Sequence, residues 1–185
     1  MNDRTATLMR AKSKVDSKLT NYRISFVLDA QGQEKYYFTQ ATDSKATFFE
    51  LRGGGHTQID YADLVGGMAY ELDADKKCGE RIPIDDAEDF RGLTFHVAGH
   101  LLFMYEGSKD NMKRIGNEKM LGRDTTVYLH SFSNGEMRFW IDNEYGLALK
   151  YEQTGGQAAK VYVTEFTVGG VTVAGMVNID EYDIE

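Results

Sequence analysis

Two histidines four residues apart are the most suggestive candidates for chemistry in this sequence. Residues at positions i and i+4 share a helical face, so His96 and His100 could place two imidazoles on one metal ion. The pattern lacks the glutamate of zinc metalloproteases, and Asp86, Glu88 and Asp89 lie two to three turns away. We therefore expect no metal site here, and interpret both histidines as hydrogen-bonded residues at the edge of a buried face. A metal-dependent enzyme using His96 and His100 is a minor alternative.

The possible nucleophiles lack the partners that catalysis requires. Cys78 follows two lysines, but no His or Asn stands near it in sequence, and it is interpreted as an ordinary thiol. Ser133-Asn-Gly precedes a strand pattern, which is typical of a hairpin and not of a nucleophile elbow. The glycines at 53–55 are followed by no Lys-Ser/Thr and no helix start, so they predict a hairpin tip. We expect no catalytic residue and no cofactor.

The charge distribution argues against nucleic acid as a partner. The 185 residues contain 21 Lys plus Arg against 29 Asp plus Glu, a net charge of −8, with no basic stripe. The acidic terminus, residues 180–185, could attract a cation, but contiguous charges on a final edge strand more often prevent pairing with another chain.

The hydrophobic period indicates two helices among many strands. Apolar residues at steps of three and four predict helices over 3–19 and 86–105, and the second is apolar on two opposite sides. Alternating patterns between glycine- and aspartate-rich turns predict strands. The expected strands cover 22–28, 34–41, 46–51, 58–61, 68–72, 76–82, 111–121, 125–132, 136–141, 147–153, 160–168 and 171–177.

These elements predict an α+β domain that spans residues 1–185. About ten or eleven strands joined by tight turns are too many for a small flat sheet, so we expect a strongly curved antiparallel sheet. A helix that is apolar on both sides should be enclosed or lie over an apolar surface.

Three segments of the second half carry a family resemblance. Ile115–Tyr128 contains G-N-E-K-M-L-G-R, Gly135–Glu152 contains W-I-D-N-E-Y-G-L-A-L-K, and Val163–Gly169 contains T-E-F. With the N-Y-R-I-S-F run that begins at Asn21, they resemble the LolA-like superfamily of lipoprotein carriers, which includes LppX-type proteins. Ala148 stands where the family pattern often has Pro, a departure that matters little.

The resemblance implies an incomplete β-barrel, in which helices cover the concave face of a strongly curved antiparallel sheet. The hollow of such a barrel often holds acyl chains. It implies a non-enzymatic protein that binds or carries a lipid, an acyl chain or the acyl group of a lipoprotein, with the apolar helix around 97–104 as a displaceable lid. Aromatic residues make up 12% of the chain, although core packing alone would explain them. The expected ligand-binding residues are Phe26, Phe38, Val97, Leu101, Leu102, Phe103, Phe139 and Leu149.

The resemblance also implies a place in the bacterial envelope, periplasmic or at the cell surface. That expectation assumes a signal or lipoprotein segment upstream of residue 1, so membrane association would depend on a tether outside this sequence. Partners would be the hydrophobic ligand and, in some relatives, another envelope protein. The alternative function is an envelope interaction or sensor lipoprotein with a filled core and no ligand.

Overall fold

The fold of the described residues is almost entirely β-structure. The computed structural model describes residues 19–84, 111–156 and 158–185. Their strands are β1 (Tyr22–Ala30), β2 (Tyr36–Thr42), β3 (Ala46–Gly53), β4 (His56–Asp63), β5 (Met68–Asp73), β6 (Cys78–Pro83), β7 (Lys113–Met120), β8 (Arg123–Phe132), β9 (Gly135–Asp142), β10 (Ala148–Thr154), β11 (Ala159–Val168) and β12 (Asp183–Ile184), with a 3-10 helix, η2 (Ile179–Glu181).

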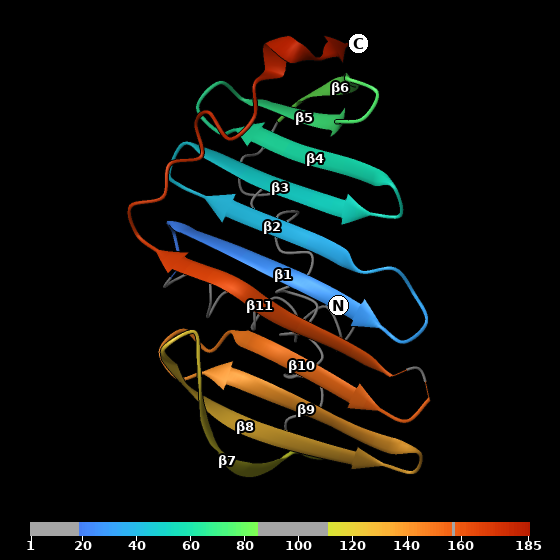
Figure 1. Cartoon of the computed structure of the whole chain (residues 1–185). Coiled ribbons are helices and arrows are strands. Elements are labelled where there is room, and N and C mark those ends of the chain that lie inside the picture. The colour runs from blue at the N-terminus through green and yellow to red at the C-terminus, as the bar shows by residue number, and fades with distance from the viewer. Residues whose placement is uncertain (1–18, 85–110, 157) are drawn as a thin grey trace, which may run out of the picture. The chain divides into compact units, whose positions relative to one another are not determined.

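Hydrogen bonds join the strands in the order β12-β6-β5-β4-β3-β2-β1-β11-β10-β9-β8-β7 (Figure 1). Consecutive strands from β2 to β6 and from β7 to β11 pair antiparallel, whereas β12 pairs parallel to β6. The hairpin tip predicted at 53–55 is confirmed, because Gly53 pairs with His56 across a two-residue turn. Gly54 and Gly55 both have positive φ, of 63° and 71°, the conformation that a type I′ turn requires.

The strands divide between two compact units, and the break falls within β1 and β11. Unit 1 contains β7 to β10 with residues 27–33 and the β11 residues up to Thr164. Unit 2 contains β2 to β6 and β12 with residues 20–26 and 165–185.

In unit 2, the chain after β11 packs against one side of β2 to β5. Val173 is fully buried in a cluster with Ala41, Phe48, Ile59 and Leu72. Figure 1 shows this segment in red, running from the end of β11 to β6. We predicted a strand over 171–177, and that prediction is wrong: its backbone amides bond to side chains, Val171 N to Asn21 Oδ1 (2.9 Å) and Val173 N to Asp43 Oδ2 (2.9 Å).

In unit 1, alternate residues of β8 to β11 face opposite sides of the sheet. A cross-strand row of Tyr128, Phe139, Tyr151 and Val161 lies on one side, because each residue is directly opposite the next in register. Trp140 and Lys150 lie on the other side. The alternation predicted from the sequence is therefore the alternation of the structure.

The predicted α+β class, with helices covering the concave face, is wrong. The described residues form one twelve-stranded sheet and no α-helix, because their backbone groups are satisfied by strand pairing and short turns. Both segments that carried the helical pattern fall almost wholly outside the described residues, since 1–18 and 85–110 are not among them. Within the described chain, no helix has the length and apolar character needed to cross a bilayer.

Candidate functional site

Half of the residues expected to bind ligand lie in the described part of the chain. Phe26 is buried in unit 2, and Phe139 and Leu149 are fully buried in unit 1. Phe38, on β2, is half-buried, with its ring centroid 6.2 Å from that of Phe49. The other four, Val97, Leu101, Leu102 and Phe103, lie outside the described residues, as do His96 and His100.

The row Tyr128-Phe139-Tyr151-Val161, here the apolar row, crosses four strands of unit 1. Phe139, Tyr151 and Val161 are 0%, 4% and 7% exposed, and the rings of Phe139 and Tyr151 lie with centroids 5.0 Å apart. Burial raises the pKa of Tyr151, whose hydroxyl donates to Gln153 Oε1. The side chains on this side of the strands are therefore mainly apolar.

The opposite side of the same strands is a network of charged and aromatic side chains. Trp140 Nε1 donates to Glu118 Oε2 at 2.7 Å, and Lys150 Nζ lies 4.0 Å from the Trp140 ring centroid. Glu152 accepts ion pairs from Lys150 (2.8 Å) and Lys160 (3.5 Å). Burial alone would raise the pKa of Glu152, but these two ammonium groups outweigh it and lower the pKa. Charged groups therefore surround Trp140 on this side of the strands.

A polar hollow of about 420 Å³ lies beside the turns that follow β7 and β9, and Arg123 and Asp142 line it. Arg123 Nε donates to Asp142 Oδ2 at 2.6 Å, and Asp142 Oδ1 accepts the backbone amides of Glu144 (3.1 Å) and Tyr145 (2.7 Å). The hydrogen bond to Asp142 raises the pKa of Arg123. These hydrogen bonds hold the two turns in place, so Arg123 and Asp142 have a structural role.

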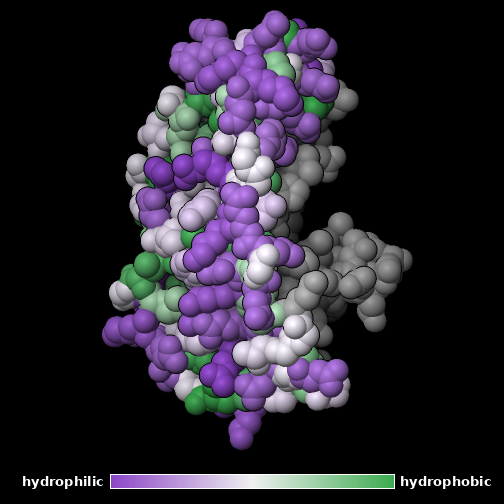
Figure 2. Space-filling view, turned by 45° about the vertical axis from the view of Figure 1, so that its right-hand side comes forward, coloured by the Kyte–Doolittle hydropathy of each residue, from purple (hydrophilic) through white to green (hydrophobic). Residues whose placement is uncertain are grey.

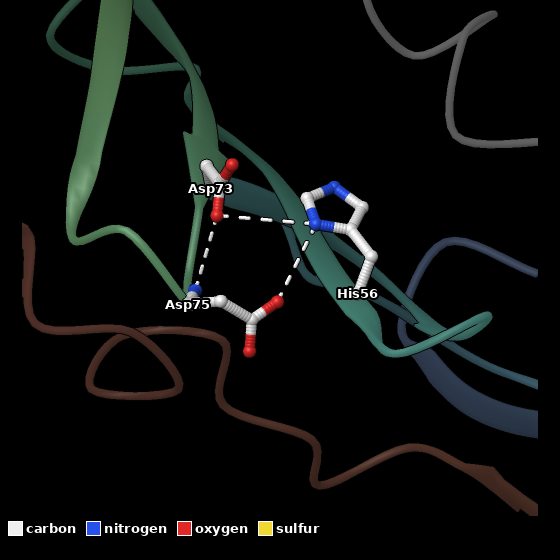
Figure 3. Close-up of side chains that lie close together, drawn as sticks. All are labelled: His56, Asp73 and Asp75. Carbon is white, nitrogen blue, oxygen red and sulfur yellow. Dashed lines mark hydrogen bonds and ion pairs between the residues drawn. The ribbon is translucent and has the colours of Figure 1, made fainter.

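Unit 2 carries a second polar hollow, of about 410 Å³, on β4, β5, β6 and β12. At its rim His56 Nδ1 lies 3.4 Å from Asp75 Oδ2 and 3.9 Å from Asp73 Oδ1. Figure 3 shows the three side chains pointing toward one another from the start of β4 and from the end of β5 with the turn that follows it. His56 begins β4 and the two aspartates flank the start of the β5–β6 turn, so the register of β4 with β5 brings them together.

Sequence reasoning missed this cluster. The only signal was a histidine after the Gly-Gly turn and an Asp-Ala-Asp turn, in strands that pair as neighbours. Cys78, interpreted as an ordinary thiol, is exposed on β6 opposite Asp73 and lines the same hollow. Nitrogen and oxygen donors thus meet at one end of these strands, and the Cys78 thiol lines the same hollow.

Comparison with solved structures shows the fold. An uncharacterized conserved protein from Thermus thermophilus matches with a TM-score of 0.53 at 10% identity, over 96% of this chain and 97% of that one. MucB matches with a TM-score of 0.53 at 14% identity, over 94% of this chain and 62% of MucB. The Pseudomonas aeruginosa MucA/MucB complex gives 0.51 at 17% identity, over 94% and 59%. This chain thus spans about three fifths of MucB.

No family profile and no curated protein matches by sequence. The structural likeness shows that this chain shares the fold of these proteins.

Proposed function

We propose that this chain uses its LolA-like fold to bind or carry a lipid, an acyl chain or the acyl group of a lipoprotein in the cell envelope. The proposal includes a single LolA-like domain over residues 1–185, an extracytoplasmic location and no enzymatic activity. It assigns ligand contact to the residues expected from the sequence, including those outside the described chain.

The observation that carries the proposal is the difference in polarity between the two sides of β8 to β11. The apolar row puts buried aromatic and aliphatic side chains on one side, and the charged network occupies the other. Each CH₂ group of an acyl chain transferred from water to such a surface is stabilised by about 0.8 kcal/mol. An acyl chain of ordinary length therefore needs no charged group for affinity.

A fluorescent fatty-acid titration tests the assignment of ligand contacts. Leu102→Asp should lower the affinity, because a carboxylate at an expected contact disfavours an acyl chain. The matched control is Val65→Asp, since Val65 is 76% exposed in the β4–β5 turn and should not matter. An affinity that is unchanged in Leu102→Asp rejects Leu102 as a ligand contact.

A second candidate function is an envelope protein that contacts a partner protein and holds no ligand. The observation that favours it is the likeness to MucB, which is seen in a complex with MucA. Gentle purification followed by native mass spectrometry separates the two functions: co-purified lipid favours the carrier, and a clean protein mass favours the interaction protein.

A further inference from the structure

One side of β4, β5, β6 and β12 carries aligned carboxylates. Asp60 pairs directly with Glu71, and Glu71 pairs directly with Glu80, so like charges face one another across two strand boundaries. Directly opposite like charges destabilise a sheet. Gln58 donates to Asp60, but no described Lys, Arg or His forms an ion pair with Glu71 or Glu80. Figure 2 shows a nearly continuous hydrophilic surface over β6 and the C-terminal segment.

At the rim of this acidic surface, the His56 cluster differs from a patch of carboxylates because it contains a nitrogen donor. Three ligand atoms, His56 Nδ1, Asp73 Oδ1 and Asp75 Oδ2, lie within 4.8 Å of one another. Imidazole nitrogen suits zinc and its neighbours among the transition metals, whereas calcium and magnesium prefer oxygen alone.

The spacing of these atoms fits a small metal ion. Zinc bonds to nitrogen and carboxylate oxygen at about 2.0–2.2 Å, so tetrahedral ligands stand roughly 3.4 Å apart. The separation between His56 Nδ1 and Asp75 Oδ2 is 3.4 Å, and that between His56 Nδ1 and Asp73 Oδ1 is 3.9 Å. The distance to Asp75 matches the separation of two zinc ligands. The distance to Asp73 is longer, so one of the two side chains would have to move by about half an ångström.

Backbone hydrogen bonds hold both carboxylates in place. Asp73 Oδ1 accepts the amides of Asp75 (3.1 Å) and Lys76 (2.9 Å), and Asp75 Oδ2 accepts the amide of Thr57 (2.6 Å). Lys76 Nζ lies 2.7 Å from the other oxygen of Asp73, and Oδ1, which accepts the two amides, also lies 3.9 Å from His56 Nδ1. His56 is half-exposed, so an ion from solvent reaches the cluster directly.

We propose that His56, Asp73 and Asp75 form a binding site for one divalent transition-metal ion, with Zn²⁺ as the best match. Water or a side chain from the adjoining hollow completes the coordination. The ion connects the β3–β4 and β5–β6 turns and reduces the repulsion among the nearby carboxylates. This site is separate from the proposed acyl-binding residues, so either proposal can fail without the other.

Calorimetric titration of the full chain with ZnCl₂ tests the site. The experiment uses a His96→Ala/His100→Ala background, because those two histidines are a second possible zinc pair in the sequence. We expect one ion per chain, and a loss of affinity of at least about tenfold when His56→Ala or Asp75→Asn is added. His130→Ala is the matched control, since His130 is the other described histidine and lies on β8 in unit 1.

Two further measurements make the result decisive. Circular dichroism checks that each variant is folded, and a parallel titration with CaCl₂ reports binding by carboxylates alone. The proposal is overturned if zinc does not bind in the background variant, if His56→Ala binds zinc as tightly as the background, or if calcium binds as tightly as zinc.

Discussion

Arg123 and Asp142 form a two-point ion pair that joins the turn after β7 to the turn after β9. Arg123 Nε lies 2.6 Å from Asp142 Oδ2, and Arg123 Nη2 lies 3.2 Å from Asp142 Oδ1. These residues belong to the G-R and W-I-D elements of the family pattern, and Trp140 and Glu118 of the same pattern are joined by a hydrogen bond of 2.7 Å. The pattern is therefore a signature of two strand connections, which explains why it identifies the fold and not an activity.

Removal of Arg123 should strongly destabilise the protein. Asp142 is 1% exposed, so Arg123→Ala leaves a buried carboxylate without its main cation. Breaking such a pair from one side typically costs about 3–5 kcal/mol of unfolding free energy. Urea unfolding measures this loss of unfolding free energy. Arg138→Ala, which removes an exposed pair with Glu136, is the control and should change stability by less than about 1 kcal/mol. Equal losses in both variants would contradict the structural role of the Arg123–Asp142 pair.

Asp43 should make the stability of unit 2 depend on acid pH. Burial tends to raise the pKa of Asp43, but the amides of Val173, Lys45 and Ala46 outweigh it and lower the pKa below 3.8. Because the folded pKa lies below the unfolded one, the stabilisation is complete above about pH 4 and is lost as pH falls through the folded pKa. Asp43→Ala should lose about 1–3 kcal/mol near pH 7 and progressively less below pH 4.

Hydrogen exchange separates this effect from general destabilisation. In Asp43→Ala the amide of Val173 should exchange faster, because its acceptor is gone. Asp124→Ala, which removes an exposed ion pair with Lys119, should change neither the Val173 exchange nor the pH profile. If the stability of Asp43→Ala depends on pH in the same way as that of the native protein, the role assigned to the Asp43 carboxylate is contradicted.

Two glycines on strands should respond oppositely to alanine. A Cβ on Gly135 would overlap the backbone carbonyl of Thr154, so Gly135→Ala should cost about 2–4 kcal/mol. A Cβ added to Gly116, on β7, would meet no atom within 4 Å, so Gly116→Ala should be neutral or stabilising by about 0.5 kcal/mol. Thermal or urea unfolding of both variants measures the difference. A tolerated Gly135→Ala would show that the β8–β9 and β10–β11 turns approach less closely.

The chain's single tryptophan should report which side of β9 the ligand uses. Phe139 and Trp140 are consecutive, so their side chains point to opposite sides of the strand. A fatty acid brominated on its acyl chain should therefore quench Trp140 only weakly. In Trp140→Phe/Phe139→Trp, the new indole replaces an expected ligand contact on the other side of β9 and should be quenched strongly. Strong quenching of native Trp140 with none in the variant would place the ligand on the charged side.

Most of the strands could be predicted because their signals are local. Alternation of apolar and polar residues marked β1 to β11, and Gly54-Gly55 marked a hairpin whose register needs nothing from elsewhere in the chain. The row from Tyr128 to Val161 follows from the same alternation once the strands are paired in sequence order.

The features that were missed depend on residues far apart in sequence. Residues 171–177 alternate like a strand, but Asn21 and Asp43 supply the hydrogen bonds from 150 and 130 residues away. His56 reaches Asp73 and Asp75 only through the register of β4 with β5. The spacing of His96 and His100 can be recognised in the sequence because the two residues are four positions apart. His56 and the two aspartates are too far apart in sequence to form such a pattern.

The central claim is that the protein binds an acyl chain, and native mass spectrometry of the gently purified full chain tests it most directly. We expect a population that is heavier than the bare chain by the mass of one lipid or fatty acid. Organic extraction should remove this added mass, and added fatty acid should restore it. Only the bare protein mass, before and after incubation with excess fatty acid, would contradict it.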